Sequence, residues 1–319
     1  MILPMFLALV ALTVAAPGMA RAQEWPTRPV RVIVPFPAGG STDVGARLIG
    51  EYLTRVFGQQ VYVENKSGAN ATIGIEAAAK SAPDGYTILV ATDAVTSNPH
   101  LYRMNFDPLK QLEPVIQLSR QPMVLAVHPS LGINSLAELV ALAKQQPRLR
   151  YATGSGVGAQ HMVVQWFARL ADIKLEQVPY RGGAPAINDL LAGHVKIGSL
   201  GSTPLIPHYK AGTLRLLAQS TKARSPSLPD VPTFEEAGIK GLVLDQWLGV
   251  LVPTRTPPAI ISRLNAEINK ALAEATIRES LLQSGQEPVG GSAAQFVQLV
   301  HDDYENYGRL VKELNIKAN

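Results

Sequence analysis

Cysteine is absent from this 319-residue chain, and its absence excludes disulfide bonds and thiolate metal sites. Metal patterns built on histidine are missing as well, because there is no His-Glu-x-x-His sequence and the six histidines are isolated from one another. The chain also has no EF-hand loop and no phosphate-binding P-loop. These absences predict a protein that uses no metal and no cofactor.

No serine has the sequence surroundings of a hydrolase nucleophile. The Gly-x-Ser-x-Gly elbow needs glycine two residues before the serine, but Thr153 stands there for Ser155, and Ile197 stands there for Ser199. The glycines of residues 154–158 have the wrong spacing for a dinucleotide turn. We therefore expect no enzymatic activity, and an exported hydrolase with an unrecognised triad is the alternative.

Clusters of positive charge are lacking too. The chain has 29 lysines and arginines against 25 acidic residues, a formal net charge of +4, and the basic residues are scattered without interleaved aromatic rings. A nucleic-acid partner is therefore not expected. A mildly basic exported protein fits a small anionic ligand better.

Long apolar runs are absent except at residues 2–16. This run is followed by Ala20-Arg21-Ala22, a small-x-small pattern that favours a secretory signal cleaved after Ala22. No lysine or arginine precedes the run, so the usual positive start of a signal is missing. An uncleaved anchor is the less favoured alternative because the run is short. We expect a periplasmic protein that begins near residue 23.

What the chain has instead is glycine turns that follow strand patterns. Residues 30–34 are almost all β-branched, residues 35–43 read Pro-Phe-Pro-Ala-Gly-Gly-Ser-Thr-Asp, and apolar residues at helical spacing come next. Gly39 and Gly40 permit a sharp turn and a close approach of a ligand, and we expect Ser41 or Thr42 to cap the helix. Free N–H groups at such a helix start favour an anion. An ordinary capped turn is the alternative.

A glycine-rich turn between a strand pattern and a helix pattern occurs twice more. Residues 178–183 read Val-Pro-Tyr-Arg-Gly-Gly before a helical pattern, and residues 153–158 read Thr-Gly-Ser-Gly-Val-Gly before another. Three turns of this kind in one chain favour anion binding over three unrelated turns.

Strand and helix patterns alternate along the chain, which predicts an α/β fold with mostly parallel sheets and helices on both faces. We expect two lobes separated by a cleft, with two crossovers near Gln121-Pro122 and near Trp247-Leu248. Lobe 1 would comprise residues 23–121 and 248–319, and lobe 2 residues 122–247. The C-terminal helical segments would pack on lobe 1.

Six motifs occur in one order along the chain: residues 34–43, 63–69, 82–86, 151–156 with His161, 178–185 and 228–238. On these motifs the chain resembles the Bug family, the periplasmic solute-binding proteins of tripartite tricarboxylate transporters. The resemblance implies a Venus-flytrap protein that closes on a carboxylate and delivers it to a membrane permease. We expect a monomer.

In members of that family, the second lobe holds one carboxylate with N–H groups and hydroxyls, and the glycine loop of the first lobe meets the ligand. Carried over to this chain, the first-lobe candidates are Phe36, Ala38, Gly39, Gly40, Ser41, Thr42, Asp43 and Thr92. The second-lobe candidates are Thr153, Ser155, Gly156, His161, Arg181, Gly182 and Gly183.

Four of these candidates have a second interpretation. Phe36 either stacks on a flat ligand or packs beside the end of its strand. Arg181 either pairs with the carboxylate or is a solvated loop residue. His161 either donates toward the cleft or packs within its helix. Asp43 would repel an anion, so it more plausibly orders its own helix start or a water.

One departure from the family pattern bears on the ligand. The family commonly carries acidic residues after the segment that corresponds to residues 193–195, whereas residues 196–201 here contain none. Without a carboxylate in the cleft, a buried ammonium group would be costly. A dicarboxylate or an aromatic carboxylate is therefore favoured over an amino acid. A binding protein that feeds a signalling partner instead of a permease is a further alternative.

Overall fold

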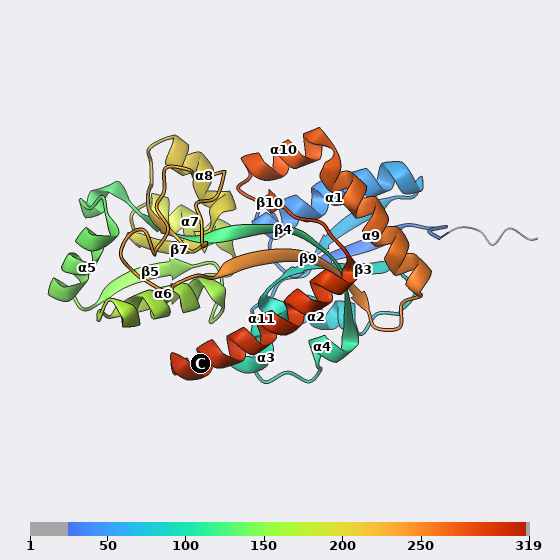
Figure 1. The fold of residues 1–319 in the computed structure, drawn as a ribbon, viewed down its shortest axis with the longest axis horizontal. Coiled ribbons are helices and arrows are strands. Elements are labelled where there is room, and N and C mark those ends of the chain that lie inside the picture. Colours follow the sequence, from blue (N-terminus) through green and yellow to red (C-terminus); the bar gives the residue numbers. More distant parts are fainter. Residues whose placement is uncertain (1–24, 317–319) are drawn as a thin grey trace, which may run out of the picture.

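Two long strands run through the middle of the molecule and belong to both of its lobes. In the computed structural model, which describes residues 25–316, β4 (Leu112–Val127) and β9 (Asp245–Pro253) pair antiparallel from Leu112 opposite Pro253 to Pro122 opposite Asp245. Beyond Pro122, β4 pairs with β7 and β8 instead. Figure 1 shows the two lobes side by side with β4 and β9 between them.

Lobe 1 contains a parallel unit in the order β2 (Val61–Asn65), β1 (Val30–Val34), β3 (Thr87–Thr92), to which β9, β4 and the short β10 (Glu287–Pro288) add antiparallel. Side chains of a strand alternate between its faces, so Val32 and Ile33 belong to different core clusters. The helices of this lobe are α1 (Ser41–Phe57), α2 (Thr72–Ala79), α3 (Ala94–Leu101), α4 (Pro108–Gln111), α9 (Pro258–Ala273) and α10 (Ala275–Gln283).

Lobe 2 is built around the end of β4 and around β7 (Ile197–Gly201), β5 (Leu149–Thr153) and β6 (Leu175–Pro179), with β8 (Arg215–Gln219) also on β4. Strands β5, β6 and β7 are parallel. The helices are α5 (Leu136–Gln145), α6 (Ala159–Leu170), α7 (Gly183–Leu191) and α8 (Ser202–Lys210), with a 3-10 turn, η1, at Pro129–Leu131. The predicted α/β class, with a parallel unit in each lobe, is confirmed.

The last helix, α11 (Ala293–Glu313), is shared between the lobes. Phe296 and Val300 pack in a core cluster of lobe 1, whereas Tyr307 and Leu310 pack in a core cluster of lobe 2. In Figure 1 this red helix runs beneath the central strands from one lobe toward the other. The sequence predicted that this segment packs on lobe 1, and the packing of its second half on lobe 2 was not predicted. The helix is therefore a third link between the lobes.

The two crossovers lie where the core contacts change. Leu242 and Leu244 pack in the core of lobe 2, and Trp247 and Leu248 pack in the core of lobe 1.

The predicted signal segment, residues 1–22, lies outside the described residues. Among residues 25–316, no helix is both long and apolar enough to cross a membrane.

Candidate ligand-binding site

Four helices with glycine N-caps begin at one cavity between the lobes, which we call the inner cavity, and α3, whose N-cap is Asp93, begins there as well. The N-cap residues of α1, α6, α7 and α8 are Gly40, Gly158, Gly182 and Gly201, and all four line this cavity. None of these helices has a side chain that caps its N-terminus. The first N–H groups of a helix have no acceptor within the helix. The cavity therefore receives uncapped donors and the positive ends of helix dipoles from both lobes.

Of the helices that begin elsewhere, three have a side-chain cap, whereas α2, α9 and α10 have none. Asp107 caps α4, Ser135 caps α5 and Ser292 caps α11, each by accepting a hydrogen bond from a backbone N–H of the first turn. Glycine at the cavity supplies no such acceptor. Glycine at those four starts leaves the donors available to a ligand, and this pattern fits an anion.

The inner cavity has a volume of about 80 Å³. Because about 10–15 Å³ in this measure holds one water, the space suits about six waters or a small organic acid. No lysine, arginine or histidine of the described chain lines it. Its lining residues are Phe36, Pro37, Ala38, Gly40, Ser41, Thr42, Asn70, Thr92, Asp93, Ala94, Ser97, Gly154, Ser155, Gly158, Ala159, Gln160, Gly182, Gly183, Ala184, Leu200, Gly201, Pro204 and Gln246.

The glycine turn of lobe 1 is held by Asp43. Its carboxylate accepts hydrogen bonds from the Gly39 N–H at 3.0 Å, from Arg47 Nε at 2.9 Å and from Asn65 Nδ2 at 2.8 Å. Burial acts to raise the pKa of Asp43, but these hydrogen bonds outweigh it and hold the pKa below its usual value. Asp43 does not line the inner cavity, and its hydrogen bonds order the turn.

The expectation that Ser41 or Thr42 caps α1 is wrong. The helix begins at Ser41 with Gly40 as N-cap, and no side chain caps it. The Ser41 hydroxyl accepts a hydrogen bond from Gln121 Nε2 at 2.8 Å. This contact ties the start of α1 to the crossover on β4.

The corresponding turn of lobe 2 is shaped by Thr153 and Gly154. Thr153 Oγ1 donates to the Ser155 carbonyl at 2.7 Å and accepts from Gln177 Nε2 at 2.8 Å, so its hydroxyl orders the turn. A Cβ on Gly154 would lie 2.8 Å from the Gly183 backbone nitrogen, so only glycine lets this turn pack against the start of α7. The Ser155 hydroxyl lines the inner cavity and makes no hydrogen bond to another described residue.

His161 lies outside the inner cavity. Gln165 Nε2 donates to the Tyr151 hydroxyl, which can therefore donate its proton to His161 Nδ1 at 2.7 Å. Burial lowers the pKa of His161 to about 4, so the ring is neutral near pH 7. The packing interpretation of this histidine therefore fits the geometry better than ligand contact.

The predicted residues fall into three places. Those on the inner cavity are Phe36, Ala38, Gly40, Ser41, Thr42, Thr92, Ser155, Gly182 and Gly183. Gly39, Asp43, Thr153 and His161 support the walls or lie behind them. Gly156 and Arg181 line a second, larger cavity, which we call the outer cavity.

The sequence predictions overlooked Asp93, a carboxyl that lines the inner cavity and is 2% exposed. It follows β3 and accepts hydrogen bonds from the Tyr307 hydroxyl at 2.7 Å and from Gln246 Nε2 at 3.0 Å. Burial raises its pKa. The premise that the cleft contains no carboxyl group is therefore wrong. An acidic residue at the end of a buried strand was the available signal.

Two glutamines join the crossovers to the cavity wall. Gln121 Nε2 donates to Gln246 Oε1 at 2.7 Å as well as to Ser41, and Gln121 Oε1 accepts from the Thr203 hydroxyl at 3.0 Å. A Cβ on Gly201 would lie 2.7 Å from Gln121 Nε2, so the glutamine packs tightly against the start of α8. This pair connects β4, β9, α1 and α8 directly.

The lobes touch one another between the two cavities. Asn70 Nδ2 donates to the Val157 carbonyl at 3.0 Å, and the Tyr102 hydroxyl donates to the same carbonyl and accepts from the Val157 N–H, both at 2.9 Å. A Cβ on Gly182 would meet the Pro37 ring at 2.9 Å. The arrangement is that of a closed pair of lobes.

A family model described as "Tripartite tricarboxylate transporter family receptor" matches residues 45–316. The chain belongs to this family. Protein BugT of Bordetella pertussis is similar, with 35% identity over 318 residues and 98% of each chain covered. The resemblance to the Bug family that the motifs predicted is thus confirmed, and the chain is a solute-binding receptor by family.

Solved structures give the same result. R. palustris Rpa4515 with adipate is 34% identical, has a TM-score of 0.89, and covers 93% of this chain and 100% of its own. MatC from Rhodopseudomonas palustris with bound malate is 28% identical, has a TM-score of 0.82, and covers 90% and 100%. The two-lobed fold predicted from sequence is therefore confirmed.

Within residues 25–316, no group of three or more histidines and acidic residues is placed to hold a metal ion.

Proposed function

We propose that this chain is a periplasmic receptor that captures a small organic carboxylate by lobe closure and delivers it to a tripartite tricarboxylate transporter permease. The observation that carries the proposal is the convergence of four uncapped helix N-termini on a cavity without a cationic side chain. Oriented N–H groups in a space with little water bind a carboxylate strongly because its charge is little screened there. The relatives with adipate and malate support the same ligand class.

The proposed ligand contacts are the starts of α1, α6 and α7 and the Ser155 hydroxyl. Closure would bring them together as the lobes rotate about β4 and β9, with the boundaries of the lobes near residues 122 and 247. The protein would act as a monomer, exported by the segment of residues 1–22.

We still favour a dicarboxylate or an aromatic carboxylate over an amino acid. The reason is no longer the absence of a carboxyl group but the environment of Asp93. Both oxygens of Asp93 already accept hydrogen bonds, from Gln246 and Tyr307. Burial also favours the neutral acid, which cannot compensate an ammonium charge. The small volume of the inner cavity further favours acids of few atoms.

A thermal-shift panel tests this proposal. Adipate, malate, benzoate and citrate would be compared with aspartate and glutamate at one pH and salt concentration. A ligand at a hundredfold excess over its dissociation constant stabilises the folded state by about 2.7 kcal/mol. We expect at least one plain carboxylate to raise the melting temperature. Stabilisation by amino acids alone would contradict the ligand class, and turnover of a ligand would contradict the receptor function.

A further inference from the structure

The outer cavity is large and carries a different kind of charge from the inner one. Its volume is about 800 Å³. Arg103, just after α3 in lobe 1, and Arg181, just before α7 in lobe 2, both line it. Among the described residues that line it, none is aspartate or glutamate. Two guanidinium groups from opposite lobes therefore share a cavity that offers them no carboxylate.

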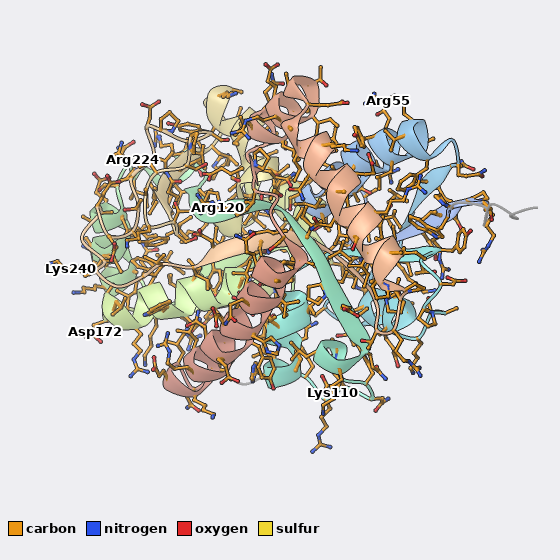
Figure 2. All side chains as sticks on the ribbon, turned by 45° about the vertical axis from the view of Figure 1, so that its right-hand side comes forward. Arg55, Lys110, Arg120, Asp172, Arg224 and Lys240 are labelled. Carbon is orange, nitrogen blue, oxygen red and sulfur yellow. The ribbon has the colours of Figure 1, made fainter. Side chains whose placement is uncertain are left out.

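These two arginines also make no ion pair or hydrogen bond with any described residue. Many other arginines of the described chain do: Arg31 pairs with Glu64, Arg55 with Glu274 and Arg224 with Glu236. Arg55 and Arg224 lie at the periphery in Figure 2. The charges of Arg103 and Arg181 are thus left for a mobile anion, and arginine suits a carboxylate because its guanidinium can donate two parallel hydrogen bonds.

The outer cavity adjoins the inner one. Phe36, Pro37, Asn70, Gly154, Ser155 and Gly182 line both. Residues of this shared wall also make the contacts that close the lobes, Asn70 with Val157 and Pro37 with Gly182. Separation of the lobes would break these contacts and open a path from the outer cavity to the helix N-termini of the inner one.

We propose that the outer cavity is a capture site for the incoming carboxylate, with Arg103 and Arg181 as its two binding residues. This inference rests on the proposed function and deepens it. The arginines attract the anion while the lobes are apart, and the N–H groups of the inner cavity take it over before closure. Because the inner cavity has no cation, the long-range attraction comes from the outer one. The two residues act on the rate of association more than on the rate of dissociation.

Stopped-flow tryptophan fluorescence with adipate, malate and benzoate tests this division. Each acid that stabilises the wild type would be mixed with wild type and with the double variant R103A/R181A at several ionic strengths. We expect the association rate constant to fall about tenfold at low salt, and the difference to disappear at high salt. The dissociation rate constant should change by less than about twofold.

The matched control is R148A/R278A, which removes one arginine from each lobe. Arg148 precedes β5 and Arg278 lies in α10, both are exposed, and neither lines either cavity. A second variant, R103K/R181K, keeps both charges and should associate at close to the wild-type rate.

Three other outcomes of these measurements would overturn the capture site. Equal association rates for R103A/R181A and R148A/R278A would overturn the capture site and leave the proposed function intact. An unchanged association rate with faster dissociation of adipate alone would mean that the arginines hold a second carboxylate in the closed state, which also overturns it. If neither these three acids nor citrate stabilises the wild type, the proposed ligand class fails and the capture site fails with it.

Discussion

The two cavities between the lobes offer an anion opposite environments. The inner one is small, is lined by helix starts and hydroxyls, and contains one carboxyl, Asp93, but no cationic side chain. The outer one has about ten times the volume, about 800 against about 80 Å³, and contains Arg103 and Arg181 but no carboxyl group among its lining residues. The cationic side chains therefore line the larger cavity, and the backbone dipoles of helix starts line the smaller one.

This difference has a physical reason. A guanidinium buried without a partner pays a desolvation penalty of several kcal/mol, whereas backbone dipoles at helix starts are already oriented and carry no net charge. A receptor must also release its ligand. Release is easier when the carboxylate is held by backbone N–H groups than when it forms an ion pair with a cationic side chain. The inner cavity therefore suits holding, and the outer cavity suits attraction.

The largest expected effect comes from placing a negative charge in the inner cavity. Gly158 has an extended backbone that any residue can adopt, and a Cβ there would meet only ordinary contacts. In G158D the carboxylate would cap α6 and repel the ligand, so affinity should fall by about 100-fold or more while stability is kept or raised. Isothermal titration and thermal unfolding measure both. The control A294D adds the same charge to the first turn of α11, and an equal loss there would contradict the account.

A smaller effect is expected at the crossovers. Q121A removes the hydrogen bonds to Ser41 and Gln246 and leaves buried polar groups unpaired, at a cost of about 1–3 kcal/mol in stability. Because the starts of α1 and α8 lose their common support, we expect affinity to fall about tenfold. Titration of the same acid measures this, with Q117A, on the same strand but outside both cavities, as control. Unchanged affinity in Q121A would remove the glutamine pair from the binding mechanism.

The Asp303 carboxyl should be mostly protonated near pH 6. Burial first, and then the neighbouring Asp93 carboxyl, raise the pKa of Asp303 to about 7, while its carboxylate oxygen accepts from Thr96 and Trp247. Since this folded pKa exceeds the unfolded value of 3.8, the folded state binds more protons between about pH 4 and pH 7. The contribution of Asp303 to the free energy of unfolding therefore falls as the pH rises through that window.

The variant D303N lacks this titration. Relative to it, the wild type should lose on the order of 1–3 kcal/mol of stability between about pH 4.5 and pH 7.5, as measured by urea unfolding. Parallel pH profiles for the two proteins would show that Asp303 is not held neutral in the folded state.

The smallest effect on binding is expected at His161. H161A removes the acceptor of the Tyr151 hydroxyl and should lower stability by about 1–3 kcal/mol, with less than about a twofold change in affinity. Thermal unfolding and titration separate the two quantities. A large loss of affinity with normal stability would return His161 to the ligand site.

Local sequence patterns predicted the glycine turns well. Residues such as Gly40, Ser41 and Gly182 line the inner cavity because a strand that ends in a glycine turn places the next helix start at the sheet edge. The position of Arg181 was harder to predict from the sequence. Gly182 has φ +137°, and the direction of the chain at this glycine decides which cavity Arg181 lines. The glycine pair predicted a turn there, but no local pattern predicted which cavity Arg181 lines.

Long-range partners could not be predicted at all. Tyr307, which donates to Asp93, is 214 residues away in the sequence, and Gln246 is 125 residues from Gln121. Helix α11 was expected on lobe 1 because it follows other lobe 1 elements, but its second half carries apolar residues that complete the core of lobe 2. Such contacts depend on the tertiary arrangement rather than on any pattern within the segment.

A crystal structure of the complex with the most stabilising acid tests the central claim most directly. The account predicts a ligand carboxylate in the inner cavity, with its oxygens within about 3.2 Å of backbone N–H groups at the starts of α1, α6 or α7. A carboxylate bound instead by Arg103 and Arg181 in the outer cavity, with the lobes closed as here and the inner cavity filled only by water, would contradict it.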